Sequence, residues 1–219
     1  MDLGISGKWA LVCGASKGLG LGCARALVQE GVNVLMVARG TEALQAAAAQ
    51  LIDSFASQNG AIVQWLATDI TTEAGRAAVL AQRAEFDIVV TNAGGPPTGD
   101  FRNFERDDWI RALDANMLTP IALIKATVDG MAAKGVTINN LLPGAFDTER
   151  LQSIFQGAAA KTAQPVDTVA AARRNTIPAK RFGSIDEFGA ICAFLCSQQA
   201  GYMTGQNVLA DGGAYPGTF

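Results

Sequence analysis

A glycine-rich turn near the amino terminus is the first feature of the chain that could carry chemistry. It follows a short apolar run, Trp9 to Cys13, and precedes a helical pattern. Glycines permit a tight turn and let the backbone amides at the start of a helix approach a phosphate group. The spacing is Gly-x-x-x-Gly-x-Gly rather than the general Gly-x-Gly-x-x-Gly fingerprint, so an ordinary strand-to-helix turn remains the alternative. The turn's position after a first strand favours a phosphate cradle, formed by Gly14, Ser16, Lys17, Gly18, Leu19 and Gly20.

The end of the second apolar run indicates which dinucleotide this cradle prefers. In a fold that binds NAD, an acidic residue about 20 positions after the glycine turn would hold the ribose 2′-hydroxyl. The chain has Ala38 and Arg39 there instead. An arginine suits a 2′-phosphate, and Lys17 adds a second positive charge on the same side, although either cation is also compatible with a solvated surface position. The pair predicts NADP as the cofactor in preference to NAD.

The elements that must position these residues alternate between strand and helix patterns. Apolar runs predict strands at 9–13, 32–38, 61–67, 86–90, 136–142 and around 207–210. Helical patterns lie between them, ending before Gly31 and then covering 41–55, 72–84, 106–131 and 184–198. Thr41 is the predicted N-cap of the second helix, and Ser184 with Glu187 predicts a capping box. The least regular stretch, 144–181, is predicted to be a surface lid or substrate loop.

This alternation predicts an α/β fold, a three-layer, doubly wound, Rossmann-like parallel sheet with helices on both faces. Ligands then bind at the carboxyl ends of the strands. No repeat, low-complexity tract or linker divides the sequence. We therefore expect residues 1–219 to form a single dinucleotide-binding domain.

Motifs over nearly the whole chain resemble those of the short-chain dehydrogenase/reductase family, especially its 3-oxoacyl reductase-like members. The glycine turn has the family's spacing, and the segment from Thr204 to Gly213 is similar to the family's carboxyl-terminal strand. The resemblance implies an adenine and ribose site at Asp69, Ile70, Asn92, Ala93 and Gly94, and a nicotinamide site at Pro143, Gly144 and Thr148. It also implies a catalytic role for Asn116, although a helix asparagine can simply bond to the backbone.

The activity that the resemblance implies is hydride transfer between NADP(H) and a ketone or secondary alcohol. Family members use a tyrosine as the general acid or base, a nearby lysine, a serine and the asparagine. In the family, the serine and Tyr-x-x-x-Lys lie between the long helix and the strand before Pro143. This chain passes directly from Lys134 to Gly135 at that point, and its tyrosines, Tyr202 and Tyr215, have no lysine four positions later.

The absent stretch corresponds to about one strand and one helix, a whole βα unit. One explanation is that the natural protein carries this segment and the present sequence lacks it. The other is a real deletion, after which 136–142 could move into the vacated strand position. We favour the first, because removing an interior strand exposes apolar surface or forces repacking. A real deletion would leave a catalytically impaired cofactor-binding module that pairs with or regulates an intact relative.

Composition limits the partners of the chain. Its 219 residues are 49% hydrophobic and 17% charged, with a net charge of −3 and scattered basic residues, which argues against a nucleic-acid partner. No apolar run is long enough for a bilayer, and Asp2 precedes a glycine turn rather than a cleavage site, so we expect a cytoplasmic protein. The four cysteines are predicted to be buried thiols, and the absence of histidine leaves no usual metal site. The family resemblance implies a homo-oligomer that acts on a small molecule.

Overall fold

Apolar segments of the amino-terminal half form a buried parallel sheet. The computed structural model describes residues 2–95, 99–132 and 134–217. Within them, β1 (Trp9–Cys13), β2 (Asn33–Ala38), β3 (Val63–Ala67) and β4 (Ile88–Val90) are ordered β3-β2-β1-β4. The central strands lie in register, with Leu11 opposite both Leu35 and Val89. The predicted α/β fold with a parallel, Rossmann-like sheet is confirmed.

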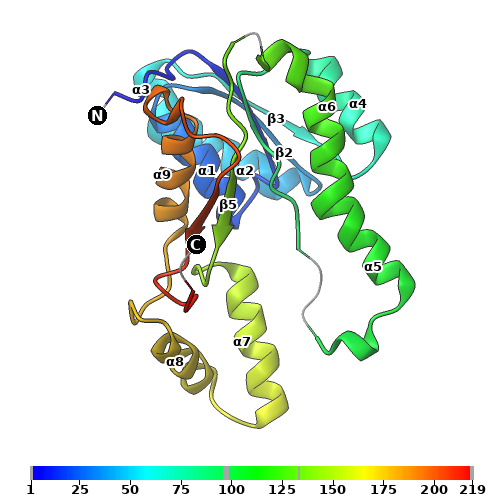
Figure 1. The fold of residues 1–219 in the computed structure, drawn as a ribbon, viewed down its shortest axis with the longest axis vertical. Helices are drawn as coiled ribbons and strands as arrows, with labels where there is room; N and C mark the ends of the chain where they lie inside the picture. Colours follow the sequence, from blue (N-terminus) through cyan, green and yellow to red (C-terminus); the bar gives the residue numbers. More distant parts are fainter. Residues whose placement is uncertain (1, 96–98, 133, 218–219) are drawn as a thin grey trace.

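Helices cover both faces of this sheet, so the predicted three layers are present. Alternate residues of β1 point to opposite faces, as in any strand. On one face lies a core built with α1 (Gly18–Gln29), α2 (Thr41–Leu51) and α9 (Ile185–Leu195). On the other, α4 (Glu73–Gln82) and α6 (Thr119–Ala132) contribute Val79 and Leu123. Figure 1 shows α9 and α6 on opposite sides of the strands.

Helices α1 and α9 pack closely against each other. A Cβ atom added at Gly22 would lie 2.2 Å from the carbonyl oxygen of Ile185, and one added at Gly189 would lie 2.2 Å from that of Gly22. These two glycines let the helix backbones touch. Cys23 and Cys192 are buried beside this crossing and all four cysteines are free, as predicted, although Cys196 is only partly buried.

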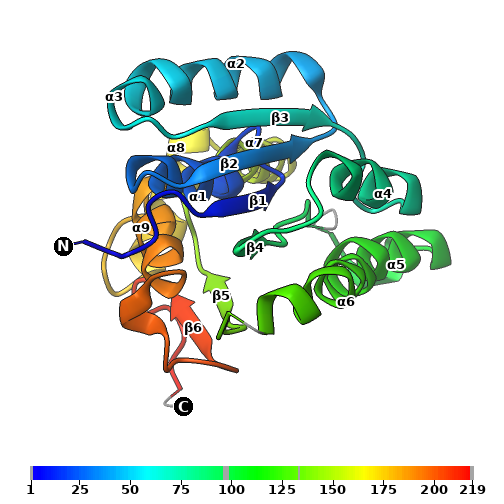
Figure 2. The same cartoon turned by 90° about the horizontal axis from the view of Figure 1, so that it is seen from above.

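The carboxyl-terminal strands form a separate small sheet. β5 (Asn140–Pro143) and β6 (Asn207–Ala210) pair in parallel, and within the described residues neither pairs with β4. Figure 2 shows this pair set apart from the four-stranded sheet. The predicted strand at 136–142 therefore begins only at Asn140, and it has not moved into a position beside β4. The parallel sheet is interrupted at the point where the sequence lacks a βα unit.

The predicted irregular lid at 144–181 is wrong, because the segment contains two helices, α7 (Glu149–Thr162) and α8 (Val166–Thr176). The Thr148 hydroxyl caps α7 by accepting a hydrogen bond from the Leu151 amide at 3.3 Å. Only Phe155 and Ala159 of α7 are buried. A helix with so narrow a buried face has a weak apolar periodicity, which explains the error.

The predicted continuous helix at 106–131 is also interrupted. It consists of α5 (Arg106–Leu113), the π-helical turn η3 (Asp114–Leu118) and α6. A similar π-helical turn, η1 (Ile52–Ala56), followed by α3 (Ser57–Asn59), ends the second helix. Such turns leave no clear mark in apolar spacing.

Several element ends differ from those predicted. Gly40, not Thr41, is the N-cap of α2, and Thr41 is its first residue. Strands β2, β3 and β4 begin one or two residues later than expected, and α4 begins after Thr72, which caps it. The Ser184 and Glu187 capping box and the last strand are confirmed, but α9 ends at Leu195. Two short 3-10 turns, η2 (Phe101–Asn103) and η4 (Gln198–Ala200), complete the description.

Candidate functional site

The glycine turn has a backbone that other residues could not adopt or fit. Gly14 and Gly18 have φ values of +62° and +58°. A Cβ atom at Gly14 would lie 2.6 Å from the Asn92 side-chain nitrogen, and one at Gly20 would lie 2.2 Å from the Gly14 carbonyl oxygen. The Asn92 amide in turn donates to the Cys13 carbonyl at 3.3 Å. This hydrogen bond and the close approach at Gly14 hold the glycine turn against the residues that follow β4.

Helix α1 opens from this turn at Gly18, with Lys17 as its N-cap. The Lys17 backbone is extended and its side chain makes no cap hydrogen bond. The first amides of any helix lack intrahelical partners and carry partial positive charge, so those at Gly18, Leu19 and Gly20 suit an anion. The turn has no side chain at its three glycines, and the phosphates of a dinucleotide therefore fit the residues present.

The end of β2 lies against the glycine turn. The Ala15 amide donates to the Val37 carbonyl at 3.1 Å, and Ala38 and Arg39 follow directly. Arg39 is exposed, and it makes no hydrogen bond or ion pair within the part of the chain that the structure describes. This cation therefore remains available at the carboxyl edge of the sheet.

Asp69 lies at the same edge, after β3. Its carboxylate accepts hydrogen bonds from the Thr71 amide at 3.0 Å and from the Thr71 hydroxyl at 2.8 Å. Partial burial raises the pKa of Asp69, but these hydrogen bonds and the positive charge of Arg39 outweigh it and lower the pKa below its usual value. Asp69 is therefore ionised at neutral pH with a fixed orientation, and Ile70 behind it is buried.

The residues predicted to face nicotinamide reach the same region from the other sheet. Gly144 follows β5, and a Cβ there would lie 2.5 Å from the Cα of Asp211, so Pro143-Gly144 closely abuts the end of β6. Thr148 lies at the glycine turn, because a Cβ on Gly18 would be 3.7 Å from its methyl carbon. Lys17 Nζ is 2.6 Å from Glu149 Oε2. The start of α7 therefore contacts the cradle, and the Lys17–Glu149 pair is a contact that sequence reasoning missed.

Asn116 lies on the π-helical turn η3, apart from these contacts. Its side chain is exposed, and its amide donates to the Ala112 carbonyl at 3.0 Å. This is the backbone hydrogen bond that the sequence analysis gave as the alternative to a catalytic role for Asn116. The structure thus brings Asn116 into no contact with the cradle, and its π-helical setting is the feature that sequence reasoning missed.

The loop after β4 is only partly described. Ala93 and Gly94 follow Asn92, and a Cβ at Gly94 would meet open space. Beside Gly95 lies the Arg150 guanidinium, the closest group to a Cβ placed there. Residues 96–98 of this loop lie outside the described residues. Phe146, before α7, and Phe155, within it, are packing residues, because they are 7% and 3% exposed.

Neither tyrosine of the chain is buried. Tyr202 is fully exposed and Tyr215 is 55% exposed, both near the carboxyl terminus. After α6 the chain turns at once, with the Lys134 amide donating to the Met131 carbonyl at 2.9 Å and Lys134 Nζ lying 3.0 Å from Asp87. The turn from α6 toward β5 therefore supplies no general acid.

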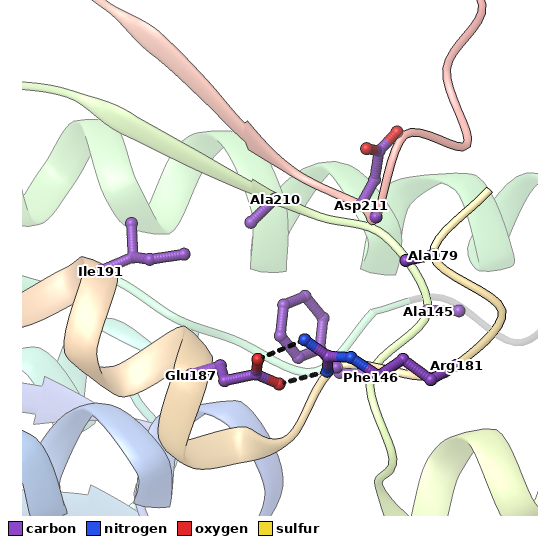
Figure 3. Close-up of a pocket in the computed structure, with 10 residues that line it drawn as sticks. Ala145, Phe146, Ala179, Arg181, Glu187, Ile191, Ala210 and Asp211 are labelled. Atoms are coloured by element: carbon purple, nitrogen blue, oxygen red, sulfur yellow. Dashed lines mark hydrogen bonds and ion pairs between the residues drawn. The ribbon is translucent and has the colours of Figure 1, made fainter. Parts of the chain in front are cut away.

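A cavity of about 200 Å³ lies beside the ends of β5 and β6, and it is lined by Ala145 and Asp211, the immediate neighbours of Gly144. Figure 3 shows Arg181 bound to Glu187 within it, with both carboxylate oxygens engaged. The Glu187 carboxylate accepts hydrogen bonds from Arg181 and from the Ser184 amide, and these hold its pKa at about 2. Because its charges are satisfied by one another, we assign no ligand to this cavity.

Two kinds of functional feature are absent from the described residues. No cluster of acidic or cysteine side chains has the arrangement of a metal site. No helix of the described chain is both long and apolar enough to cross a bilayer.

The chain matches known oxidoreductases along most of its length. Residues 8–135 match the short chain dehydrogenase family and residues 122–215 match the enoyl-(acyl carrier protein) reductase family. The 3-oxoacyl-(acyl-carrier-protein) reductase FabG of Vibrio harveyi is 27% identical, with 97% of this chain and 99% of the relative covered. Acetoacetyl-CoA reductase of Cupriavidus necator is 25% identical, with 95% and 98% covered.

The fold is also that of a solved reductase. The structure of L-sorbose reductase from Gluconobacter frateurii, complexed with NADPH and L-sorbose, is similar with a TM-score of 0.91 at 24% identity, and each chain is covered completely. The alignment with the Vibrio harveyi enzyme extends over 259 positions, more than the 219 residues of this chain. The relative therefore has residues without a counterpart here.

The parallel sheet, the glycine cradle and the motifs along the strand ends define a Rossmann-like, dinucleotide-binding oxidoreductase. With the family matches, the chain belongs to the short-chain dehydrogenase family of NAD(P)-dependent enzymes. The predicted family is confirmed.

Proposed function

We propose that residues 1–219 form one NADP-dependent oxidoreductase domain that transfers a hydride between nicotinamide and a ketone or secondary alcohol. The observation that carries this proposal is the meeting of the glycine turn with Asn92, Thr148 and the end of β2, where Arg39 is unpaired among the described residues. Arg39 and Lys17 would bind the 2′-phosphate, and Asp69 would hold adenine.

The remaining roles follow from position. The first amides of α1 would bind the pyrophosphate, Asn92 to Gly94 the ribose, and Pro143, Gly144 and Thr148 the nicotinamide end. The cofactor supplies the hydride chemistry when bound. Asn116 would support proton transfer, as in the family. The described chain offers no positioned tyrosine, and such a proton donor contributes roughly 10²–10⁴-fold in rate. We expect slow turnover with ordinary cofactor binding.

The named relatives suggest the substrates for a test. Purified protein is given NADPH or NADH with acetoacetyl-CoA, L-sorbose and simple ketones, and absorbance at the nicotinamide band follows oxidation. We expect tight NADPH binding and slow, NADPH-specific reduction of a ketone. Tight NADPH binding without turnover on any substrate would instead identify a cofactor-binding module that pairs with an intact relative. Failure to bind either dinucleotide would refute both functions.

We also propose a cytoplasmic homo-oligomer. The outward face of α5, η3 and α6 carries apolar side chains at helical spacing, with Trp109, Leu113, Met117 and Ile121 each between 45% and 52% exposed. Exposed apolar stripes of this kind mark association surfaces. Light scattering after gel filtration tests the oligomer, and a monomer at micromolar concentration would contradict it.

A further inference from the structure

The first turn of α7 contacts the cradle through consecutive side chains. Thr148 lies against Gly18, Glu149 pairs with Lys17, and the Arg150 guanidinium lies beside Gly95. In Figure 1, α7 begins beyond the end of β5, from where this turn reaches the glycine loop. The turn therefore holds the glycine loop and the β4 loop at once.

The two cations proposed to bind a 2′-phosphate differ in their present partners. Lys17 donates to the Glu149 carboxylate at 2.6 Å, and the two side chains are 67% and 72% exposed. Arg39 has no such partner in the described chain, and Asp69, the carboxylate whose pKa its charge lowers, is already bonded to Thr71. An arriving phosphate would meet a free cation at Arg39 but an occupied one at Lys17.

We propose that Glu149 is a specificity-determining residue that competes with the cofactor's 2′-phosphate for Lys17, so that binding of NADP(H) breaks the Lys17–Glu149 pair. This inference rests on the proposed function. A phosphate carries about two negative charges and binds a lysine more strongly than a carboxylate does, and it repels the carboxylate that it displaces. NAD(H) has only an uncharged hydroxyl at that position, and its binding leaves the Lys17–Glu149 pair in place.

The test compares dissociation constants for NADPH and NADH at low ionic strength, by nicotinamide fluorescence or calorimetry. Because exposed ion pairs contribute little, Glu149→Gln is expected to tighten NADPH binding by about two- to fivefold and to leave NADH binding unchanged. Asp186→Asn is the matched control. It removes one negative charge and a 2.6 Å ion pair, with Arg25, on α9, and it should change neither constant.

Repeating the Glu149→Gln substitution in a Lys17→Met variant separates competition for Lys17 from a general effect of charge. In Lys17→Met, the Glu149→Gln substitution should no longer tighten NADPH binding, since the competing cation is gone. Weaker NADPH binding by Glu149→Gln, an equal change for both cofactors, or the same gain without Lys17 would overturn the role of Glu149. If the wild-type protein prefers NADPH and the variants give one of these results, only the role of Glu149 is refuted and the proposed function is retained. Wild-type protein that binds neither dinucleotide loses both.

Discussion

The two sheets of this molecule differ sharply in how far their strands are buried. In β1 and β2, Leu11 and Leu35 are 0% and 2% exposed, with helices on both faces. In β5, Leu142 is 40% exposed, and the strand has one described neighbour, β6. Parallel strands are normally covered on both faces and paired on both edges. The amino-terminal sheet is therefore covered on both faces, whereas β5 lacks a second neighbouring strand among the described residues.

The position of the interruption explains this difference. The family resemblance predicts a βα unit that the sequence does not contain between Lys134 and Gly135, and the sheet separates between β4 and β5. Helix α9, which lies between β5 and β6 in the sequence, packs on α1 closely enough to need Gly22 and Gly189. The separation of the two sheets thus coincides with the absent segment, and the glycine turn lies in the half that is covered on both faces.

The largest expected effect is on stability and contrasts the two sheets directly. Leu11→Ala removes a fully buried side chain, which should lower the free energy of unfolding by about 2–5 kcal/mol. Leu142→Ala removes a side chain that is 40% exposed and should cost less than about 1 kcal/mol. Urea denaturation measures both. Equal costs would show that β5 is covered in solution, by a partner or by the other sheet.

A second contrast sets the α1–α9 crossing against α7. Gly22→Ala places a Cβ 2.2 Å from a backbone oxygen, and overpacking of this kind costs about 1–3 kcal/mol. Gly157→Ala, inside α7, meets open space and should stabilise the chain by up to about 1 kcal/mol through helix propensity. Thermal unfolding followed by circular dichroism distinguishes the two. A neutral Gly22→Ala would mean that the helices are farther apart than described.

The sequence predicted the amino-terminal half well because local pattern and tertiary role agree there. The apolar runs of β1 and β2 are buried except at their ends, and Cys23, Ala24, Leu27 and Val28 lie on the buried face of α1. The helices at 149–176 were missed because their exposed residues carry little periodicity. The π-helical turns were missed because they change hydrogen bonding and not composition.

The candidate site was predictable in its residues but not in its contacts. Gly14, Gly18 and Gly20 have conformations or neighbours that require glycine, which their spacing had suggested. The pairing of Lys17 with Glu149 joins positions 132 residues apart, and no local pattern encodes it. The roles assigned to the individual cofactor residues stay predictions until binding is measured.

The smallest expected effect concerns pH and belongs to the carboxyl-terminal half. Hydrogen bonds from Arg181 and the Ser184 amide lower the pKa of Glu187 from 4.5 to about 2. A lowered folded-state pKa gives stability that is present above pH 4.5 and is lost as the pH falls toward 2. The stability difference between wild type and Glu187→Gln should therefore shrink over this window. A difference that stays constant from pH 5 to 2 would contradict the pairing.

The central claim is that the cradle selects the phosphorylated dinucleotide, and Arg39→Asp tests it most directly through the ratio of the NADPH and NADH dissociation constants. Charge-assisted hydrogen bonds of about 1.5–3 kcal/mol predict a loss of NADPH affinity of roughly tenfold to hundredfold, with NADH affinity kept or improved. Arg173→Asp, an equal charge change on exposed α8, serves as the control and should leave the ratio unchanged. An unchanged ratio in Arg39→Asp would contradict the account.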